Sequence, residues 1–273
     1  MESLMLLIQI NWRIVIISIG ITAGVALLMG VIIMVIANVF TIKGQDPRID
    51  DVKENLAGAN CGGCGYAGCS DFAKALVEGK AEINDCGATN KDNKIKIASI
   101  LGKQFSGEEM ISVVACNGGI NCADKFEYKG YCDCAYANMH SSGPKACNSG
   151  CIGLGNCASV CPVEAIKIID EVAVVDRDRC IACGLCIKTC PKSIIKSIPK
   201  SAQVIVACCN ECKGKEVMDI CKVGCIACGL CARVCPHAAI HLENNLPIID
   251  YGKCTGCGLC VDKCPKNVIH KVG

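Results

Sequence analysis

Cys225-Ile-Ala-Cys228-Gly-Leu-Cys231-Ala-Arg-Val-Cys235-Pro236 is the stretch that decides the fold of this 273-residue chain. Its spacing, Cys-x2-Cys-x2-Cys-x3-Cys-Pro, is typical of bacterial proteins that hold pairs of [4Fe–4S] clusters. In such a run, three cysteines on a tight loop bind one cluster. The fourth, which we expect at the start of a helix, binds the neighbouring cluster. Proline has no amide donor to lose at the next position, and it fixes the turn out of the loop.

Three other runs of the chain end in Cys-Pro in the same way. Two are regular and the last is a variant with longer gaps: Cys180, Cys183, Cys186, Cys190-Pro191; Cys254, Cys257, Cys260, Cys264-Pro265; and Cys147, Cys151, Cys157, Cys161-Pro162. Half of the eight prolines occupy this one position. The 28 cysteines would by number alone also suit disulfides or zinc sites, but this spacing favours iron–sulfur clusters over both.

The runs recur at a distance of 74 residues. A cysteine stands 74 positions after each of Cys134, Cys147, Cys151, Cys157, Cys161, Cys180, Cys183, Cys186 and Cys190. The Pro-x-x-Ala-Ile stretch that begins at Pro162 returns at Pro236. We therefore interpret this part of the chain as a duplicated two-cluster module. Residues 172–175 and 246–249 are expected to form short strands, and the two Pro-x-x-Ala-Ile stretches single helical turns.

In cross-ligation, the first three cysteines of one run and the fourth cysteine of the other run bind the same cluster. This pattern predicts the ligands of each cluster. Three sets are complete: Cys225, Cys228, Cys231 with Cys264; Cys254, Cys257, Cys260 with Cys235; and Cys180, Cys183, Cys186 with Cys161. The fourth set is imperfect, because Leu154 stands where its repeat has Cys228. Cys151, Cys157 and Cys190 remain for that cluster. Cys147 is one candidate for the fourth ligand. However, its equivalent in the second module, Cys221, stands beside a set that already has four cysteines. The sequence therefore leaves the fourth ligand open.

A further cysteine site lies closer to the amino terminus. Cys61, Cys64, Cys69 and Cys86 follow the spacing Cys-x2-Cys-x4-Cys-x16-Cys, with glycines between them that allow the backbone to curl around a cluster. Ser70 or Asp71 can cap a helix that runs to about Val77 and buries Phe72, Ala75 and Leu76. Zinc held by four cysteines is the alternative at this site.

Eight cysteines remain outside these sets, and they form two groups. The groups are Cys116, Cys122, Cys132 and Cys134, and Cys208, Cys209, Cys212 and Cys221. Each group can ligate one more cluster, although Cys132, Cys209 and Cys212 also suit free cysteines. At four ligands per cluster, the 28 cysteines allow seven clusters at most. Five follow from the runs above, and about six is the count that we expect.

The amino terminus predicts a membrane anchor. Residues 14–42 contain no charged side chain, and about 20 apolar residues are enough for a helix to cross a bilayer. Arg13 precedes this span, whereas Lys43, Arg48 and Lys53 follow it, which favours a cytoplasmic location for the rest of the chain. The span holds no ionisable residue and therefore offers no path for an ion. Gly20 and Gly24 indicate either a helix-packing face or tolerated glycines.

Other chemistry finds little support in the sequence. The net charge of +2 does not point to nucleic acid. Gly153-Leu-Gly155-Asn-Cys-Ala158 matches a dinucleotide motif loosely, but it lies between cysteines and follows no clear strand. We assign no catalytic residue, because a relay of electrons needs no general acid or base. Lysines recur every fourth residue at 188, 192, 196 and 200; they form either a docking face for an acidic protein or an ordinary solvated surface.

Taken in order, these parts resemble the B subunit of the Rnf (Rsx) complex, in the long polyferredoxin type found in anaerobes. The resemblance rests on the amino-terminal helix, on Asn60-Cys61-Gly-Gly-Cys64-Gly-Tyr66, on Cys116-x-Gly-Gly-x-x-Cys122 and on the ferredoxin modules. Two departures, Gly87 after Cys86 and Ala57 after Leu56, where the family has proline, remove no ligand.

The resemblance implies a subunit of a membrane ferredoxin:NAD⁺ oxidoreductase that exports Na⁺ or H⁺. It implies soluble ferredoxin as electron donor and further subunits as partners, including an NAD-binding flavoprotein. A polyferredoxin subunit of a hydrogenase or a quinone reductase is the alternative. The expected fold is α+β, with a single-pass anchor in the cell membrane (1–43), a small helical Fe–S domain (44–105), a connector (106–145) and two ferredoxin modules (146–199 and 200–273).

Overall fold

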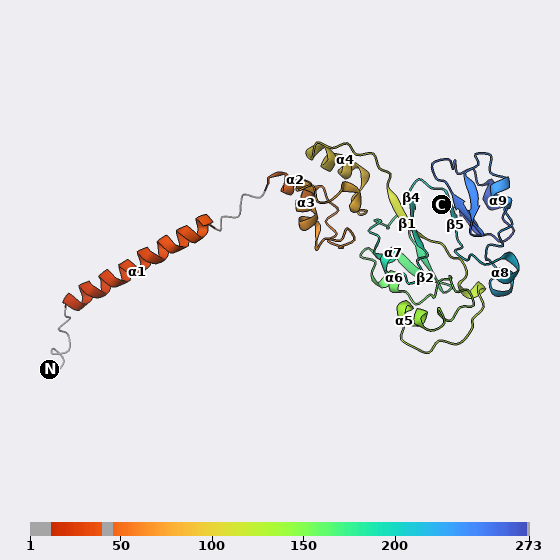
Figure 1. Ribbon diagram of the computed structural model, residues 1–273, viewed down its shortest axis with the longest axis horizontal. Coiled ribbons are helices and arrows are strands. Elements are labelled where there is room, and N and C mark those ends of the chain that lie inside the picture. Colours follow the sequence, from red (N-terminus) through yellow and green to blue (C-terminus); the bar gives the residue numbers. More distant parts are fainter. Residues whose placement is uncertain (1–11, 40–45, 272–273) are drawn as a thin grey trace. The chain divides into compact units, whose positions relative to one another are not determined.

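The computed structural model describes residues 12–39 and 46–271 of the chain (Figure 1). By its internal contacts the chain divides into two units, Met1–Pro47 and Arg48–Gly273. Within the first unit, helix α1 (Trp12–Val39) contains one stretch, Val15–Ile36, that is long and apolar enough to cross a membrane, with a mean hydropathy of 2.7. The carboxyl-terminal end of the predicted span, residues 40–42, lies outside the described residues.

The second unit begins with a small helical part that has its own apolar core. It comprises α2 (Arg48–Glu54), α3 (Cys69–Val77), the 3₁₀ helix η2 (Ile83–Asp85) and α4 (Lys91–Ile100). Val52, Phe72, Leu76 and Ile97 are almost fully buried where these helices meet. The predicted buried face of α3 is confirmed, but its start differs. Its N-cap is Gly68, and neither Ser70 nor Asp71 caps it.

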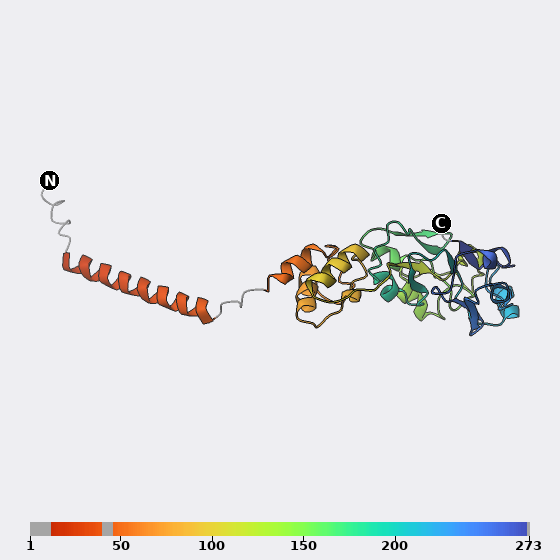
Figure 2. The same ribbon diagram turned by 90° about the horizontal axis from the view of Figure 1, so that it is seen from above.

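Four two-stranded antiparallel sheets follow (Figures 1 and 2). They pair β1 (Met110–Val114) with β4 (Ile195–Pro199), β2 (Ile166–Ile169) with β3 (Val172–Val175), β5 (Val204–Val206) with β8 (Ile269–Lys271), and β6 (Ile240–Glu243) with β7 (Leu246–Ile249). The predicted strands at 172–175 and 246–249 are therefore confirmed. Strand β1 comes from the predicted connector, so that segment contributes to the first module.

The register of the strands reveals which positions of the two modules are equivalent. Val114 pairs with Ile195, and Val206 pairs with Ile269, which lies 74 residues after Ile195. The β1–β4 sheet of the first module thus corresponds to the β5–β8 sheet of the second. Cys116 and Cys208 each follow the first strand of their sheet by the same number of residues. In the fold, Cys208 therefore corresponds to Cys116, although the 74-residue offset relates it to Cys134.

Short helices alternate with the cysteine-bearing loops of the modules. They are η3 (Gly119–Asn121), α5 (Cys134–Met139), α6 (Asn156–Ser159), α7 (Leu185–Thr189), α8 (Gly214–Ile220), α9 (Leu230–Arg233) and α10 (Leu259–Asp262). Helices α6, α7, α9 and α10 each hold the third cysteine of a run, and the fourth cysteine follows the helix. The expectation that the fourth cysteine starts a helix was therefore wrong.

A tight turn follows each Cys-Pro pair. In each turn the third residue after the cysteine has a positive φ of 48 to 53°; these residues are Glu164, Ser193, Ala238 and Asn267. The amide of that residue donates to the carbonyl of the cysteine. The predicted single helical turns at Pro-x-x-Ala-Ile are therefore wrong, because the chain makes a β-turn there and enters a strand at Ile166 or Ile240.

Candidate metal centres

The second module places four thiols around one pocket. Cys225, Cys228, Cys231 and Cys264 line about 380 Å³ of empty space, and they are the four residues that cross-ligation predicts. Within residues 12–39 and 46–271, no group of three or more Cys, His, Asp or Glu side chains converges on a position for a single metal ion. The spacing of the run favours a [4Fe–4S] cluster at this pocket over one zinc ion.

The first module has an equivalent pocket with a different fourth cysteine. Cys134, Cys151, Cys157 and Cys190 line about 390 Å³ of empty space. Cys147, the candidate from sequence, lines another pocket. The structure therefore places Cys134, and not Cys147, where Leu154 leaves the regular run without a thiol.

A small polar network holds Cys134 in this place. The Oδ1 atom of Asn156 accepts a hydrogen bond from the Cys134 amide at 2.7 Å, and its Nδ2 atom donates to Asp133 at 2.7 Å. Asp133 in turn caps α5 by accepting from the amides of Ala135 and Tyr136. The helix that begins at Cys134 is thus tied directly to the α6 segment that carries Cys157.

The two outer sets follow the same plan. Burial raises the pKa of the Cys186 thiol, and the nearby thiols of Cys180 and Cys161 raise it further. Burial likewise raises the pKa of Cys260, with Cys254 and Cys257 nearby. Cys235 packs against the same buried cluster as Cys260. Each outer set therefore gathers one run and the last cysteine of the other run in its module.

The turn after Cys-Pro aims a backbone amide at the preceding sulfur. Ala165 donates to Cys161 Sγ at 3.2 Å, Ala239 to Cys235 Sγ at 3.3 Å and Val268 to Cys264 Sγ at 3.3 Å. Hydrogen bonds to a ligating sulfur favour the more negative, reduced state of a cluster and so raise its reduction potential. The β-turns thus supply both the path of the chain and part of the electrostatic environment of the sites.

The amino-terminal set gathers at the edge of the helical core. Burial raises the pKa of the Cys64 thiol, with additional effects from Cys86 and Cys61, while Cys69 packs against the same apolar core. Asn60 Oδ1 accepts from the Cys69 amide at 2.9 Å, so this side chain closes the loop that carries the cysteines. Cys86 Sγ lies 3.3 Å from the hydroxyl of Thr89.

This amino-terminal site lies directly against the first module. A Cβ atom added to Gly63 would clash with the carbonyl oxygen of Cys183, and one added to Gly87 would clash with that of Ala182. Lys188 Nζ donates to the Gly63 carbonyl at 2.8 Å. The thiol of Cys61 also lies close enough to Cys183 to raise its pKa, after the larger effect of burial.

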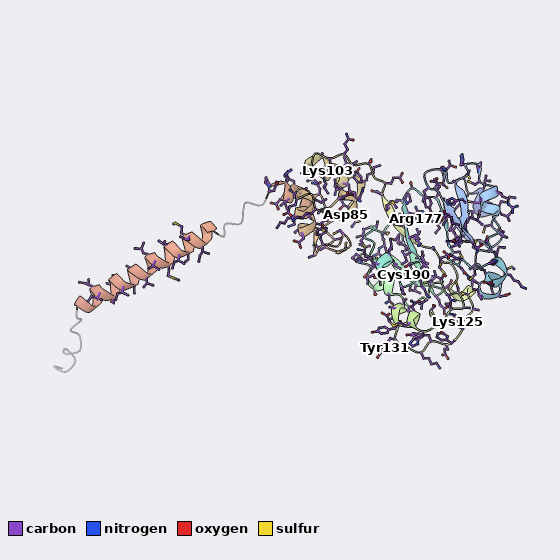
Figure 3. All side chains as sticks on the ribbon, in the orientation of Figure 1. Asp85, Lys103, Lys125, Tyr131, Arg177 and Cys190 are labelled. Atoms are coloured by element: carbon purple, nitrogen blue, oxygen red, sulfur yellow. The ribbon has the colours of Figure 1, made fainter. Side chains whose placement is uncertain are left out.

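The sites of a module also adjoin one another. Burial raises the pKa of Cys157 to about 12, and the neighbours that add to this include Cys186 of the outer set. In the second module Cys231 similarly affects Cys260. Cys190, the ligand that the outer run lends to the inner site, follows α7 (Figure 3). Buried thiols of this kind must lose their protons when they bind iron, so cluster binding is coupled to folding.

The remaining candidates from sequence, three cysteines and the spaced lysines, are exposed or make contacts outside the cysteine sets. Cys132 and Cys212 are exposed, and Cys209 Sγ donates to the Ser149 carbonyl at 3.0 Å. Of the four regularly spaced lysines, Lys192 Nζ donates to two backbone carbonyls at 2.6 Å, and Lys200 pairs with Glu109 at 3.3 Å. With Lys188 bonded to Gly63, three of the four serve separate internal contacts, which does not support a common docking face.

Comparison with known proteins identifies two kinds of domain. A family model described as a putative Fe–S cluster matches residues 56–87. A model described as a 4Fe–4S dicluster domain matches residues 150–194 and again residues 224–268. These ranges contain the amino-terminal set and the four cysteine runs, apart from Cys147.

Relatives from three anaerobes match most of the chain. The B subunit of the Na⁺-translocating ferredoxin:NAD⁺ oxidoreductase complex of Acetobacterium woodii is 41% identical, over 88% of this chain and 73% of its own length. The B subunit of the ion-translocating oxidoreductase complex of Methanosarcina acetivorans is 39% identical, over 87% and 90%. The B subunit of the proton-translocating ferredoxin:NAD⁺ oxidoreductase complex of Clostridium ljungdahlii is 40% identical, over 84% and 82%.

Proposed function

Because this chain belongs to the B-subunit family of the ion-translocating ferredoxin:NAD⁺ oxidoreductase (Rnf) complexes, we propose that it receives electrons from soluble ferredoxin and relays them through [4Fe–4S] clusters. In this role it is the electron-transfer subunit of a membrane oxidoreductase. The relay needs no general acid or base, since each cluster accepts and releases one electron. NAD binding and ion movement then belong to other subunits, among them a flavoprotein.

The contiguity of the cysteine sets is the observation that carries this proposal. The loop of the amino-terminal set (Cys61, Cys64, Cys69, Cys86) touches the outer run of module 1 where Gly63 meets Cys183. Cys186 of that outer set and Cys157 of the inner set lie in one buried cluster. In module 2, Cys231 and Cys260 likewise share one buried cluster. Sites in direct succession suit a carrier of electrons, whereas separate structural metals need no such contact.

The thiols of each set fit the [4Fe–4S] cluster that the family implies. Five sets of four cysteines would hold five [4Fe–4S] clusters: Cys61, Cys64, Cys69 and Cys86; Cys161, Cys180, Cys183 and Cys186; Cys134, Cys151, Cys157 and Cys190; Cys225, Cys228, Cys231 and Cys264; and Cys235, Cys254, Cys257 and Cys260. When bound, the clusters supply the one-electron chemistry. The protein's own part is to shield its buried thiols, such as Cys157 and Cys231, from water. It also directs the amides of Ala165, Ala239 and Val268 at the sulfurs.

Helix α1 supports the proposed location of the chain. One apolar helix supports a single-pass anchor in the cell membrane. The basic residues Lys43, Arg48 and Lys53 after the span support a cytoplasmic position for the Fe–S domains. Soluble ferredoxin would meet the clusters on that side.

Anaerobic purification of the full-length chain tests the proposal. We expect a brown protein that contains iron and acid-labile sulfide in equal amounts and is bleached by dithionite. Reduced ferredoxin should reduce it and produce the electron paramagnetic resonance of [4Fe–4S]⁺ clusters. A colourless preparation that contains zinc would refute the proposal. So would an iron protein that ferredoxin fails to reduce while dithionite succeeds.

A further inference from the structure

One pocket lined by cysteines belongs to neither module alone. Seven cysteines line about 400 Å³ of empty space, and they come from both halves of the duplicated region: Cys116, Cys122, Cys147, Cys151, Cys208, Cys209 and Cys221. Cys151 belongs to the inner set of module 1, and Cys209 Sγ donates to the Ser149 carbonyl. Five thiols therefore remain for this pocket: Cys116, Cys122, Cys147, Cys208 and Cys221. All five lie outside residues 56–87, 150–194 and 224–268, which the family models match. The two cysteine groups expected from sequence are thus wrongly divided, because this pocket draws on both groups and on Cys147.

Two of these thiols touch each other, which reduces the set to four independent positions. Cys122 and Cys221 form an antiparallel bridge, and their side chains are hydrogen-bonded. The Ala123 amide donates to the Ile220 carbonyl at 2.9 Å, and the Lys222 amide to the Asn121 carbonyl at 3.0 Å, so the backbone fixes this approach. Thiolates on different corners of a cubane stand farther apart than a hydrogen-bonded pair. Only one of these two cysteines can therefore serve as a ligand.

The internal repeat indicates which of the two it is. Cys116 and Cys208 are equivalent in the fold. Each accepts a hydrogen bond at 3.4 Å from a cysteine amide of the neighbouring inner set, Cys116 from Cys151 and Cys208 from Cys225. Cys147 and Cys221 are equivalent by the 74-residue offset. The two pairs give a set in which each module contributes the same two positions. Cys122 has no counterpart in this scheme.

We propose that Cys116, Cys147, Cys208 and Cys221 bind a sixth [4Fe–4S] cluster, which joins the two modules. This inference rests on the proposed function, since it treats the flanking sets as clusters too. The pocket has the features that such a group needs. Cys147 and Cys221 are buried, Cys116 and Cys208 are partly buried, and close glycines at 118, 150 and 224 leave space beside the thiols. Lys145 also lines the pocket, and its buried ammonium pairs with Asp124 at 2.9 Å and with Glu171.

The site completes a continuous series through the chain. Cys116 contacts the inner set of module 1 at Cys151, and Cys208 contacts the inner set of module 2 at Cys225. The series then reads outer, inner, central, inner, outer, so its order is symmetric about the shared pocket. The central site thus joins the inner set of one module to the inner set of the other.

Iron quantitation on the anaerobically purified full-length chain tests the inference. We expect the parent chain to hold six clusters, and the Cys116→Ala and Cys208→Ala variants each to hold four iron atoms fewer. Cys221→Ala should lose the same four atoms, whereas Cys122→Ala should keep them. The exposed Cys132 and Cys212 provide matched controls, whose alanine variants should retain all the iron. Mössbauer spectra then show whether the iron that remains is still in [4Fe–4S] clusters.

The outcomes separate this inference from the function on which it rests. A parent chain with five clusters, and unchanged iron in Cys116→Ala, would overturn the sixth site and leave the electron relay standing. Loss of iron from Cys122→Ala but not from Cys221→Ala would overturn the choice of ligands. A parent chain without iron would refute the proposed function itself. The count in the parent chain does not depend on whether any variant folds.

Discussion

At the scale of single residues, Cys134 shows how a thiol distant in sequence replaces a missing one. Leu154 interrupts the regular spacing of the first module, and α5 brings Cys134 to the pocket that the run leaves incomplete. Asn156 holds the Cys134 amide and also contacts Asp133, so the replacement depends on polar groups from two segments. Neither of these two polar residues was identified from the sequence as part of the site.

A rescue experiment follows from this substitution of one thiol for another. We expect Cys134→Ala to lose the inner cluster of module 1, and thus about four iron atoms per chain, because a [4Fe–4S] cluster takes four thiolates. Adding Leu154→Cys should restore the iron, because it restores the spacing of the regular runs. Iron analysis and electron paramagnetic resonance measure both effects. The matched control is Cys132→Ala, two residues away and exposed. Iron retained in Cys134→Ala would contradict the assignment.

The network around Cys134 gives a second prediction at this scale. In Asn156→Ala the Cys134 amide loses its acceptor and Asp133 loses a donor. We expect a loss of stability of about 1–3 kcal/mol, the usual cost of leaving a polar partner unsatisfied, and faster loss of one cluster to a chelator. Release of iron followed over time measures this. The control is Asn148→Ala, which removes a side-chain amide that accepts from the exposed Lys125 and should have little effect. Equal rates in both variants would count against the network.

At the scale of elements, the loops of the amino-terminal site and of module 1 meet without side chains between them. Gly63 and Gly87 face backbone carbonyl oxygens of Cys183 and Ala182, at positions where a methyl group does not fit. Lys188 reinforces the contact. The glycines therefore allow two cluster-bearing loops to touch, in addition to allowing each loop to curl.

Alanine at these glycines should separate the two loops. We expect Gly63→Ala and Gly87→Ala to cost about 1–3 kcal/mol, as is typical of overpacking. They should also slow electron transfer from the amino-terminal cluster to module 1, while the iron content stays the same. Flash reduction of the purified chain measures the rate. Gly79→Ala is the control: its φ of 73° brings backbone strain, but an added Cβ meets nothing within 4 Å. Transfer at the parent rate in both loop variants would show that the contact is unimportant.

The sequence predicted those elements that depend on neighbouring residues, but not those that depend on contacts between distant parts of the chain. The regular runs, the helix that buries Phe72 and the strands at 172–175 and 246–249 follow local rules, and the structure confirms these elements. The position of Cys116 was not predictable in this way, because it depends on pairing of β1 with β4, about 80 residues away. The 74-residue offset related Cys208 to Cys134, whereas strand register relates it to Cys116. An insertion between Cys116 and Cys147 hides that relation from the repeat.

At the scale of the whole molecule, the two parts of the second unit have different kinds of core. Residues 49–105 enclose Phe72, Leu76 and Ile97 in an ordinary apolar cluster. The clusters of buried residues in the modules are smaller and include several thiols. In the modules, therefore, bound metal must replace much of the apolar contact that holds other domains together.

Removal of iron should consequently affect the two parts unequally. A domain is stable by only about 5–15 kcal/mol, so the loss of several metal cross-links should unfold the modules. We expect amides of β1 to β8 to lose protection from hydrogen exchange after chelation under reducing conditions. Amides of α3 and α4 should remain partly protected, because their apolar core persists. Mass spectrometry of the exchanged protein resolves the two regions. Equal protection in both would contradict this account.

The division of the chain at Pro47 gives a prediction about the anchor. A chain that begins at Arg48 lacks α1 but retains every cysteine. We expect it to stay in solution without detergent and to hold as much iron per chain as the full-length protein. Ultracentrifugation and iron analysis test this. Precipitation of the shortened chain, or loss of the amino-terminal cluster, would show that the anchor also supports the cluster domains.

The order of the cysteine sets in space differs from their order in the sequence, and this has a consequence for synthesis on the ribosome. The amino-terminal set is complete once Cys86 has emerged, and the inner set of module 1 once Cys190 has emerged. The shared pocket lies beside residues made early, yet its last thiol, Cys221, arrives only after the whole first module. On the emerging chain every set up to the shared pocket is therefore complete before the two cysteine runs of module 2 appear. The two sets of module 2, which need Cys260 and Cys264, are the last that the enzymes delivering iron and sulfide can fill.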